Sequence, residues 1–168
     1  MTRWLPLALV PLLLAGCNPV ATPSLETGNG GPGVDVSRYE LKTEPATGMG
    51  VAEVRKSKET DVVVAGRIGG TAEPIGKTSA IFHLADLKLP ITEGCDTPWD
   101  FCEVPDKELK ASRITVKLVD ENGKTVPASV AELFKVKPLS VVVVKGKAQR
   151  DDYGNVTVLA TGIYVRER

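Results

Sequence analysis

The clearest pattern of apolar and polar positions in the chain runs from Arg113 to Val119. Ile114, Val116 and Leu118 alternate there with Thr115 and Lys117. A period of two places the apolar side chains on one face of a β-strand and the polar ones on the other. The segment Asp120-Glu121-Asn122-Gly123-Lys124 follows and is typical of a turn, so the pattern predicts a half-buried strand that ends at a turn.

Three further segments are rich in β-branched residues and predict strands: 61–70, 140–149 and 156–166. The segment 79–84 is another strand candidate. The last two strands in the chain are joined by Asp151-Asp152-Tyr153-Gly154-Asn155, so we expect a hairpin. Between the third and fourth strands, residues 129–134 predict a short helix. Ser129 would be its N-cap, Glu132 the capping-box partner, and Leu133 and Phe134 would face inward.

This order, three strands, one helix and two strands, is that of the OB-fold, a five-stranded Greek-key barrel. Gly66 falls where a long first strand must curl to belong to both halves of the barrel. The segments 62–68 and 141–148 resemble the first and fourth strands of OB-fold proteins. We therefore expect a mainly β, OB-fold-like barrel over residues 59–168, with another small barrel or a sandwich as the alternatives.

The first seventeen residues have the composition of a signal peptide. Arg3 precedes an apolar run from Trp4 to Leu14 that is too short to span a bilayer stably. Leu14-Ala15-Gly16-Cys17 resembles the lipobox of bacterial lipoproteins. The resemblance implies cleavage before Cys17, acylation of its sulfur and amine, and stable attachment to a membrane. In the lipoprotein families of bacteria with two membranes, Asp after the Cys tends to retain the protein in the inner membrane, so by this resemblance Asn18 favours the outer membrane. The alternative to a lipoprotein signal is a plain secretory signal with an incidental Cys.

Residues 18–58 are rich in Pro, Gly, Thr, Ser and Glu and show no sustained periodicity, so we predict a flexible linker. As a Gly-rich coil, about 40 residues would reach on the order of 35 Å. The stretch 51–58 fits either a helical turn or an edge segment of the domain. The lipobox, the linker and Pro98-Trp99-Asp100 together resemble uncharacterised lipoproteins of Planctomycetes, from which no function can be transferred.

The charge balance argues against nucleic-acid binding. The chain has 21 Lys plus Arg and 21 Asp plus Glu, whereas binding to phosphates needs clustered cations. Gly76-Lys77-Thr78 ends like a phosphate-binding loop, but Thr71 stands where that loop needs Gly, and a strand follows where it needs a helix. No motif for catalysis or for a cofactor is found, so we expect a protein that is not an enzyme and takes no cofactor.

Cys95 and Cys102 are the two thiols that remain once Cys17 is acylated. In an oxidising compartment we expect them to form a disulfide. One alternative is a soft-metal site with His83 or with Asp96 and Asp100, although the spacing is wider than in common zinc sites. A redox dithiol is the other, without the Cys-x-x-Cys spacing that such sites use.

Four residues are candidates for binding: Trp99, Phe101, His83 and Arg67. The aromatic pair would either cap an end of the barrel or present a contact surface, and a lone histidine is most often a surface or core-edge residue. Taken together, the sequence predicts a monomeric lipoprotein of the cell envelope, held to the membrane by its lipid. Its barrel would bind a protein, a glycan or a small solute; the alternative is a metal-binding or redox domain built on Cys95, Cys102 and His83.

Overall fold

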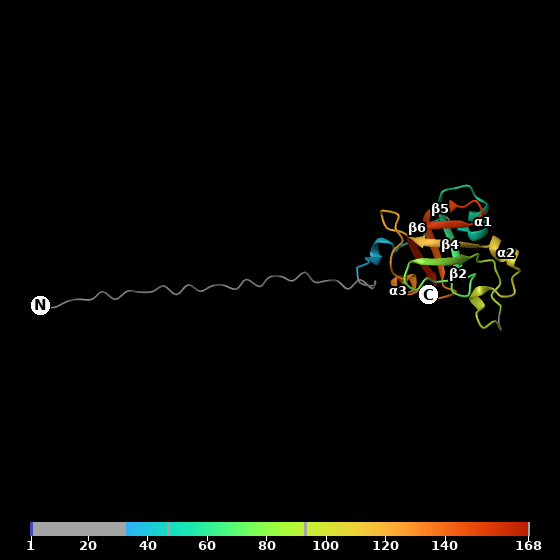
Figure 1. The fold of residues 1–168 in the computed structure, drawn as a ribbon, viewed down its shortest axis with the longest axis horizontal. Helices are drawn as coiled ribbons and strands as arrows, with labels where there is room; N and C mark the ends of the chain where they lie inside the picture. Colours follow the sequence, from blue (N-terminus) through green and yellow to red (C-terminus); the bar gives the residue numbers. More distant parts are fainter. Residues whose placement is uncertain (2–32, 47, 93, 168) are drawn as a thin grey trace.

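The computed structural model describes residues 1, 33–46, 48–92 and 94–167. The predicted signal peptide, Cys17 and the first part of the predicted linker lie outside the described residues. Five strands form a closed barrel (Figure 1): β2 (Asp61–Ile68), β3 (Ile81–Ala85), β4 (Arg113–Leu118), β5 (Val141–Arg150) and β6 (Val156–Glu167).

The strand order around the barrel is β2-β3-β4-β6-β5, and the pairing of β2 with β5 closes it. β4 and β6 run parallel, while the other barrel pairs are antiparallel. β2 pairs with β5 from Asp61 to Arg67 and with β3 only at Arg67 and Ile68, so it belongs to both halves. This is the OB-fold arrangement that the element order predicted, and it excludes the sandwich.

The barrel is filled by the inward positions of the alternating strands. In β4 the residues Ile114, Val116 and Leu118 are buried and their neighbours are half-buried, as the period of two predicted. The other strands add apolar side chains to the same core, among them Val62, Val64, Ile68, Phe82, Leu84, Val142, Val144, Val158 and Ile163.

Glycine is required where strands approach most closely. A Cβ on Gly146 would lie 2.2 Å from the carbonyl oxygen of Leu159, beside the register shift in the β5–β6 hairpin. A Cβ on Gly66 would lie 3.0 Å from the carbonyl oxygen of Ala85 and 3.1 Å from a methyl of Val51. The predicted curl at Gly66 therefore coincides with a crowded crossing of β2 and β3.

The helix predicted between the third and fourth strands is α3 (Val130–Phe134). Ser129 is its N-cap and accepts a hydrogen bond from the Ala131 N–H at 3.3 Å. Val130, Leu133 and Phe134 are buried in the barrel core, so α3 plugs one end of the barrel.

The residues described between 33 and 50 differ from the expected linker because they pack on the barrel, and the helical turn considered for 51–58 is present as a helix. They contain the 3-10 helix η1 (Val36–Arg38), the strand β1 (Met49–Gly50), parallel to β2, and the helix α1 (Val51–Lys56). Tyr39, Val51 and Val54 are buried in the core. These few apolar residues are widely spaced, which is why no periodic signal marks the segment.

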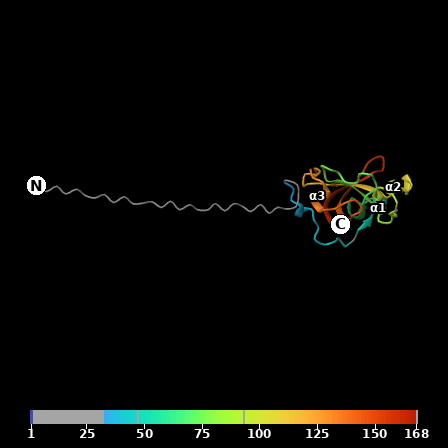
Figure 2. The same ribbon diagram turned by 90° about the horizontal axis from the view of Figure 1, so that it is seen from below.

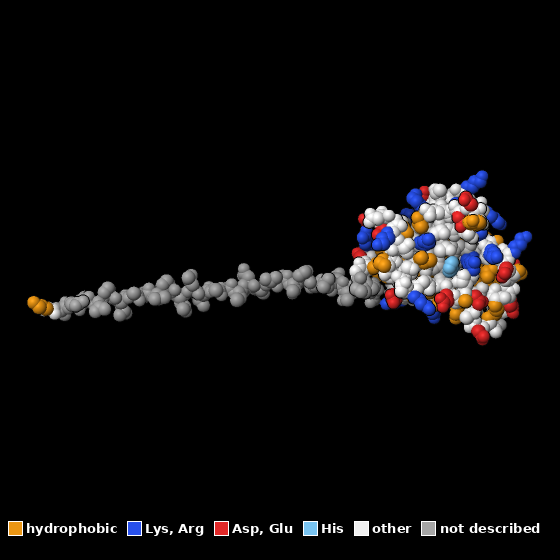
Figure 3. All heavy atoms as spheres, in the orientation of Figure 1, with side chains coloured by type: hydrophobic (Ala, Val, Ile, Leu, Met, Phe, Trp, Pro, Cys, Tyr) orange, Lys and Arg blue, Asp and Glu red, His pale blue; other side chains and the backbone are white. Residues whose placement is uncertain are grey.

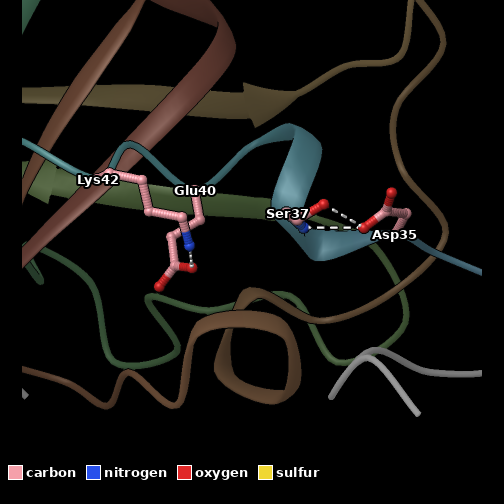
Figure 4. Close-up of polar contacts among 4 residues, drawn as sticks. All are labelled: Asp35, Ser37, Glu40 and Lys42. Carbon is pink, nitrogen blue, oxygen red and sulfur yellow. Dashed lines mark hydrogen bonds and ion pairs between the residues drawn. The ribbon is translucent and has the colours of Figure 1, made fainter. Parts of the chain in front are cut away.

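Local polar contacts hold the beginning of this segment (Figure 4). Asp35 caps η1 by accepting hydrogen bonds from the Ser37 N–H at 3.0 Å and from its hydroxyl at 2.7 Å. Lys42 forms an ion pair with Glu40 at 2.8 Å. Between them, the Ile163 N–H donates to the Tyr39 carbonyl at 2.7 Å, which fastens the segment to β6.

The connection between β3 and β4 contains two elements that the sequence did not predict. They are η2 (Pro98–Asp100) and α2 (Asp106–Ala111), and neither has a side-chain N-cap. Buried Asp86 opens the connection and accepts a hydrogen bond from the Ala52 N–H at 2.8 Å, which ties it to α1.

The short helices lie on opposite sides of the barrel. Figures 1 and 2 both show η1 and α3 on one side and α1 and α2 on the other.

Among the residues that the structure describes, no helix has the length and apolar character to cross a membrane.

Candidate binding site

The outer face of β3 and β4 carries the only histidine of the chain. His83 and Thr115 are directly opposite each other in the antiparallel pair, and Ala85 is opposite Arg113. Since side chains alternate along a strand, His83, Thr115 and Arg113 share the outward face. The His83 Nδ1 lies 3.4 Å from the Thr115 hydroxyl oxygen, a long contact.

Arg113 is held by the turn that follows β2. Its Nη1 donates a hydrogen bond to the carbonyl oxygen of Gly70. Gly70 has a φ of +90°, in the region that favours glycine, and a Cβ there would lie 2.8 Å from the Arg113 Cδ. Glycine at this position therefore lets the arginine stem lie against the backbone.

A second arginine comes from α1. Arg55 donates from Nη1 to the carbonyl oxygen of Arg113 and from Nη2 to the carbonyl oxygen of Gly154, both at 2.9 Å. These bonds connect the helix to β4 and to the turn between β5 and β6. They also fix the Arg55 guanidinium beside the outward face of β4.

These side chains surround a hollow of about 260 Å³, which we call the basic pocket. Its cations are Arg55, Lys110 of α2 and Arg113, and no Asp or Glu is among its lining residues. His83, Thr115, Tyr153 and Asn155 supply further polar groups. In Figure 3 the histidine lies beside Lys and Arg side chains on the face toward the viewer.

The cations of the basic pocket act on one another. Burial and the charge of Arg113 lower the pKa of Arg55, against a smaller opposing effect of Asp151. Burial and the same Arg113 charge lower the pKa of His83 from its ordinary value of 6.5. His83 is therefore neutral at pH 7 and has one donor and one acceptor nitrogen.

The loop between Cys95 and Cys102 lies against the same corner of the barrel. The two cysteines form a disulfide, with their Cα atoms 6.8 Å apart. The Trp99 carbonyl accepts a hydrogen bond from the Gly70 N–H at 2.7 Å, and the Trp99 Nε1 donates to the Ala72 carbonyl at 2.9 Å. The disulfide loop thus supports the turn that positions Arg113.

Phe101 and Trp99 have different surroundings. Phe101 is buried and packs with Ala85 and Leu89 in a small second core that is separate from the barrel core. Trp99 is half-buried and hydrogen-bonded to the β2–β3 turn. Both side chains therefore fasten the loop at this corner.

The other predicted site residues lie elsewhere. Arg67 is a half-buried residue of β2 outside the basic pocket, and Cys17 is outside the described residues. Among the residues in the described ranges, no three His, Cys, Asp or Glu side chains are grouped closely enough to hold a metal ion. His83 is thus not brought together with the cysteine pair in such a group.

Two larger hollows have mixed linings. One, of about 690 Å³, lies over β1, β2 and β5 and includes the ion pair of Lys147 with Asp61, 2.9 Å long. The other, of about 650 Å³, adjoins Gly33, where the described domain begins. Both have acidic and basic groups, whereas the described residues that line the basic pocket include Lys and Arg but no Asp or Glu.

Sequence reasoning found His83 of the basic pocket but missed Arg55, Lys110 and Arg113. Arg55 lies in the segment expected to be a linker, and Lys110 in a helix without a capping signal. The sequence signal that could have indicated the site is the position of Arg113 at the start of the clearest strand, on its outward face.

Compared with known proteins, the chain matches no family model and no curated protein.

Proposed function

We propose that this protein is a lipid-anchored lipoprotein of the cell envelope whose barrel is a non-catalytic binding module. The ligand is a protein, a glycan or a small solute of the envelope, and it binds at the basic pocket. The observation that carries the proposal is that three segments far apart in the sequence converge there: α1, the stretch from β3 through α2 to β4, and the β5–β6 turn. Concave sites with a few convergent polar groups are the usual form of ligand sites.

The lipobox supports the location. Leu14-Ala15-Gly16-Cys17 follows directly on an apolar run, the arrangement that resembles bacterial lipoproteins. The disulfide between Cys95 and Cys102 also suits an oxidising compartment outside the cytoplasm.

The pocket chemistry supports binding rather than catalysis. A histidine acting as a general base is normally oriented by a carboxylate. The lining of the basic pocket contains no carboxylate, and the hydroxyl of Thr115 is 3.4 Å from His83. The low pKa of His83 is explained by burial and by Arg113.

A matched pair of variants tests the proposal. Thr115→Glu places a longer, negative side chain in the basic pocket, while Thr161→Glu makes the same change at an exposed position of β6 outside it. The full chain, purified in detergent, would be tested on a glycan array and by pull-down from envelope extracts. We expect ligands that bind the wild type and Thr161→Glu but not Thr115→Glu. No ligand in either assay, or capture unaffected by Thr115→Glu, would contradict the proposal.

A further inference from the structure

The charges of the basic pocket restrict what it can bind. Arg55, Lys110 and Arg113 converge on one hollow from α1, α2 and β4, and the hollow is lined by no carboxylate. From this geometry we infer that the basic pocket binds an oxyanion, that is, a carboxylate, sulfate or phosphate group. The inference rests on the proposed function and specifies the ligand chemistry of the same site.

Both guanidinium groups are already oriented without an anion. Arg55 donates to the carbonyls of Arg113 and Gly154, and Arg113 donates to the carbonyl of Gly70. Carbonyl oxygens hold the planar groups in place but are neutral acceptors, so these bonds do not neutralise the positive charges. A guanidinium has more N–H donors than these bonds use, and its fork matches the geometry of an oxyanion. The site is thus arranged in advance, which reduces the entropy lost on binding.

The repulsion between the cations also favours a bound anion. The charge of Arg113 lowers the pKa of both Arg55 and His83, so these groups are close enough to destabilise one another when charged. Asp151 is the acid that acts on Arg55, but its oxygens accept hydrogen bonds from the Tyr153 N–H at 3.0 Å and the Asn155 N–H at 2.8 Å. The carboxylate of Asp151 therefore stabilises the turn and acts on Arg55 only from outside the lining of the pocket, which leaves room for an anion from a ligand.

The size of the pocket limits the group that enters it. A hollow of about 260 Å³ has room for roughly nine water molecules at their volume in the liquid. A free oxyanion fits, and so does a single sugar ring with its acidic substituent. Thr115 and Asn155 line the same hollow and can bond to sugar hydroxyls. The shared chemistry is the oxyanion, and its source is either a small inorganic ion or an acidic saccharide.

Calorimetric titration of the full chain in detergent separates these sources. The probes are inorganic sulfate, inorganic phosphate, a short saccharide containing uronic acid and a neutral saccharide of equal length. We expect binding of the uronic-acid saccharide or of the inorganic ions, weakened by added salt, and much weaker binding of the neutral saccharide. Binding of only the acidic saccharide identifies a saccharide ligand; equal binding of the inorganic ions identifies a small anion.

Two lysines of α2 provide a control of equal charge. Lys110 lines the basic pocket, whereas exposed Lys107 of the same helix does not. Lys110→Ala should weaken oxyanion binding by roughly threefold, and Arg113→Gln by about tenfold or more. Lys107→Ala should leave it unchanged. Because Lys110 makes no contact needed by the barrel core, its variant tests the site even if Arg113→Gln is unstable.

Two results would overturn the inference. One is equal affinity for the acidic and the neutral saccharide. The other is equal weakening by Lys107→Ala and Lys110→Ala, which would indicate a general field rather than a site. If no anionic probe binds while Thr115→Glu still abolishes capture of an envelope ligand, the oxyanion inference fails and the proposed function remains. If Thr115→Glu changes nothing, the proposed function itself fails.

Discussion

At the scale of single residues, Arg113 connects the parts of the candidate site. Its side chain donates to the Gly70 carbonyl, and its own carbonyl accepts from Arg55. Its charge lowers the pKa of both Arg55 and His83. One residue at the first position of β4 thus joins the β2–β3 turn, α1 and the only histidine. Substitutions at Gly70 and His83 test whether these contacts affect the free energy of unfolding and ligand binding.

Gly70→Ala should destabilise the protein and weaken the site. The residue has a φ of +90°, and its new Cβ would meet the Arg113 Cδ at 2.8 Å. The left-handed backbone alone costs about 1–2 kcal/mol, which urea denaturation can measure. Gly123→Ala is the matched control, because Gly123 has a φ of +76° with no atom within 4 Å of the added Cβ. If Gly70→Ala costs no more than Gly123→Ala and leaves ligand binding intact, the packing of Arg113 on Gly70 is unimportant.

The lowered pKa of His83 predicts a pH dependence of stability. In the unfolded chain the histidine takes up a proton near its ordinary pKa of 6.5, whereas in the folded protein it does so at lower pH. The charge of Arg113 opposes its protonation, and Arg55 and Lys110 line the same pocket. The unfolded state therefore binds more protons below pH 6.5, so the free energy of unfolding falls as the pH drops through this range.

Urea denaturation between pH 7.5 and about 5 measures this fall, a range that avoids the titration of the carboxylates near their ordinary values. His83→Gln should flatten the slope. The same slope in wild type and His83→Gln would show that another group is responsible.

At the scale of elements, the disulfide loop supports the site through Trp99. Its backbone carbonyl accepts from the Gly70 N–H, and its indole donates to Ala72. Phe101 anchors the same loop in a small core with Ala85 and Leu89. The disulfide between Cys95 and Cys102 closes this loop. The contacts of Trp99 and Phe101 hold its middle, so the loop keeps the β2–β3 turn beside Arg113.

The disulfide predicts a simple thiol count. The mature chain should show no titratable thiol under native or denaturing conditions until a reductant is added, because Cys95 and Cys102 are paired and the proposed anchor would acylate Cys17. The double variant Cys95→Ser, Cys102→Ser should lower the free energy of unfolding by about 2 kcal/mol, from the entropy of the opened loop. Two reactive thiols in the untreated native protein, accompanied by bound metal on elemental analysis, would support the metal site instead.

The sequence predicted the barrel elements well because their signals are local. Ile114, Val116 and Leu118 show the period of β4 within six residues, and Ser129 marks the start of α3 by its capping hydrogen bond. The elements of residues 33–58 and of the β3–β4 connection could not be predicted in the same way. β1 is two residues long, and α1 buries only Val51 and Val54, so burial there depends on partners distant in sequence.

The packing of α1 can be tested at Val54, which has no exposed surface. Val54→Ala removes two methyl groups from the core and should lower the free energy of unfolding by about 1–3 kcal/mol. Lys56→Ala, at an exposed position of the same helix, is the control and should have little effect. Equal stabilities of the two variants would mean that α1 is not part of the folded unit.

The candidate site was predictable only in part. His83 drew attention as the single histidine, but nothing local in the sequence joins it to Arg55 or Lys110. The barrel topology brings these positions together, with Arg55 reaching the backbone of Arg113 across 58 residues of sequence. Such a site has no motif, because its members are spaced by the fold and not by the chain.

At the scale of the whole molecule, the start of the described domain and the basic pocket involve different elements. The described domain begins at Gly33, beside η1, and Figures 1 and 2 show η1 and α3 on one side of the barrel and α1 and α2 on the other. The basic pocket is lined by residues of α1, α2, β3 and β4 and of the β5–β6 turn. If the chain is anchored through Cys17, its attachment enters at the η1 end. The attachment and the basic pocket would then lie on different sides of the barrel.

The anchor itself is the claim on which this orientation and the proposed function depend. Mass spectrometry of the protein isolated from the membrane fraction tests it most directly. The account predicts a mature chain that begins at Cys17 and has acyl groups on its sulfur and its amine. A Cys17→Ser variant should stay unprocessed, as a control. A wild-type chain that retains Met1, or that is recovered from the cytosol without acyl groups, would contradict the account.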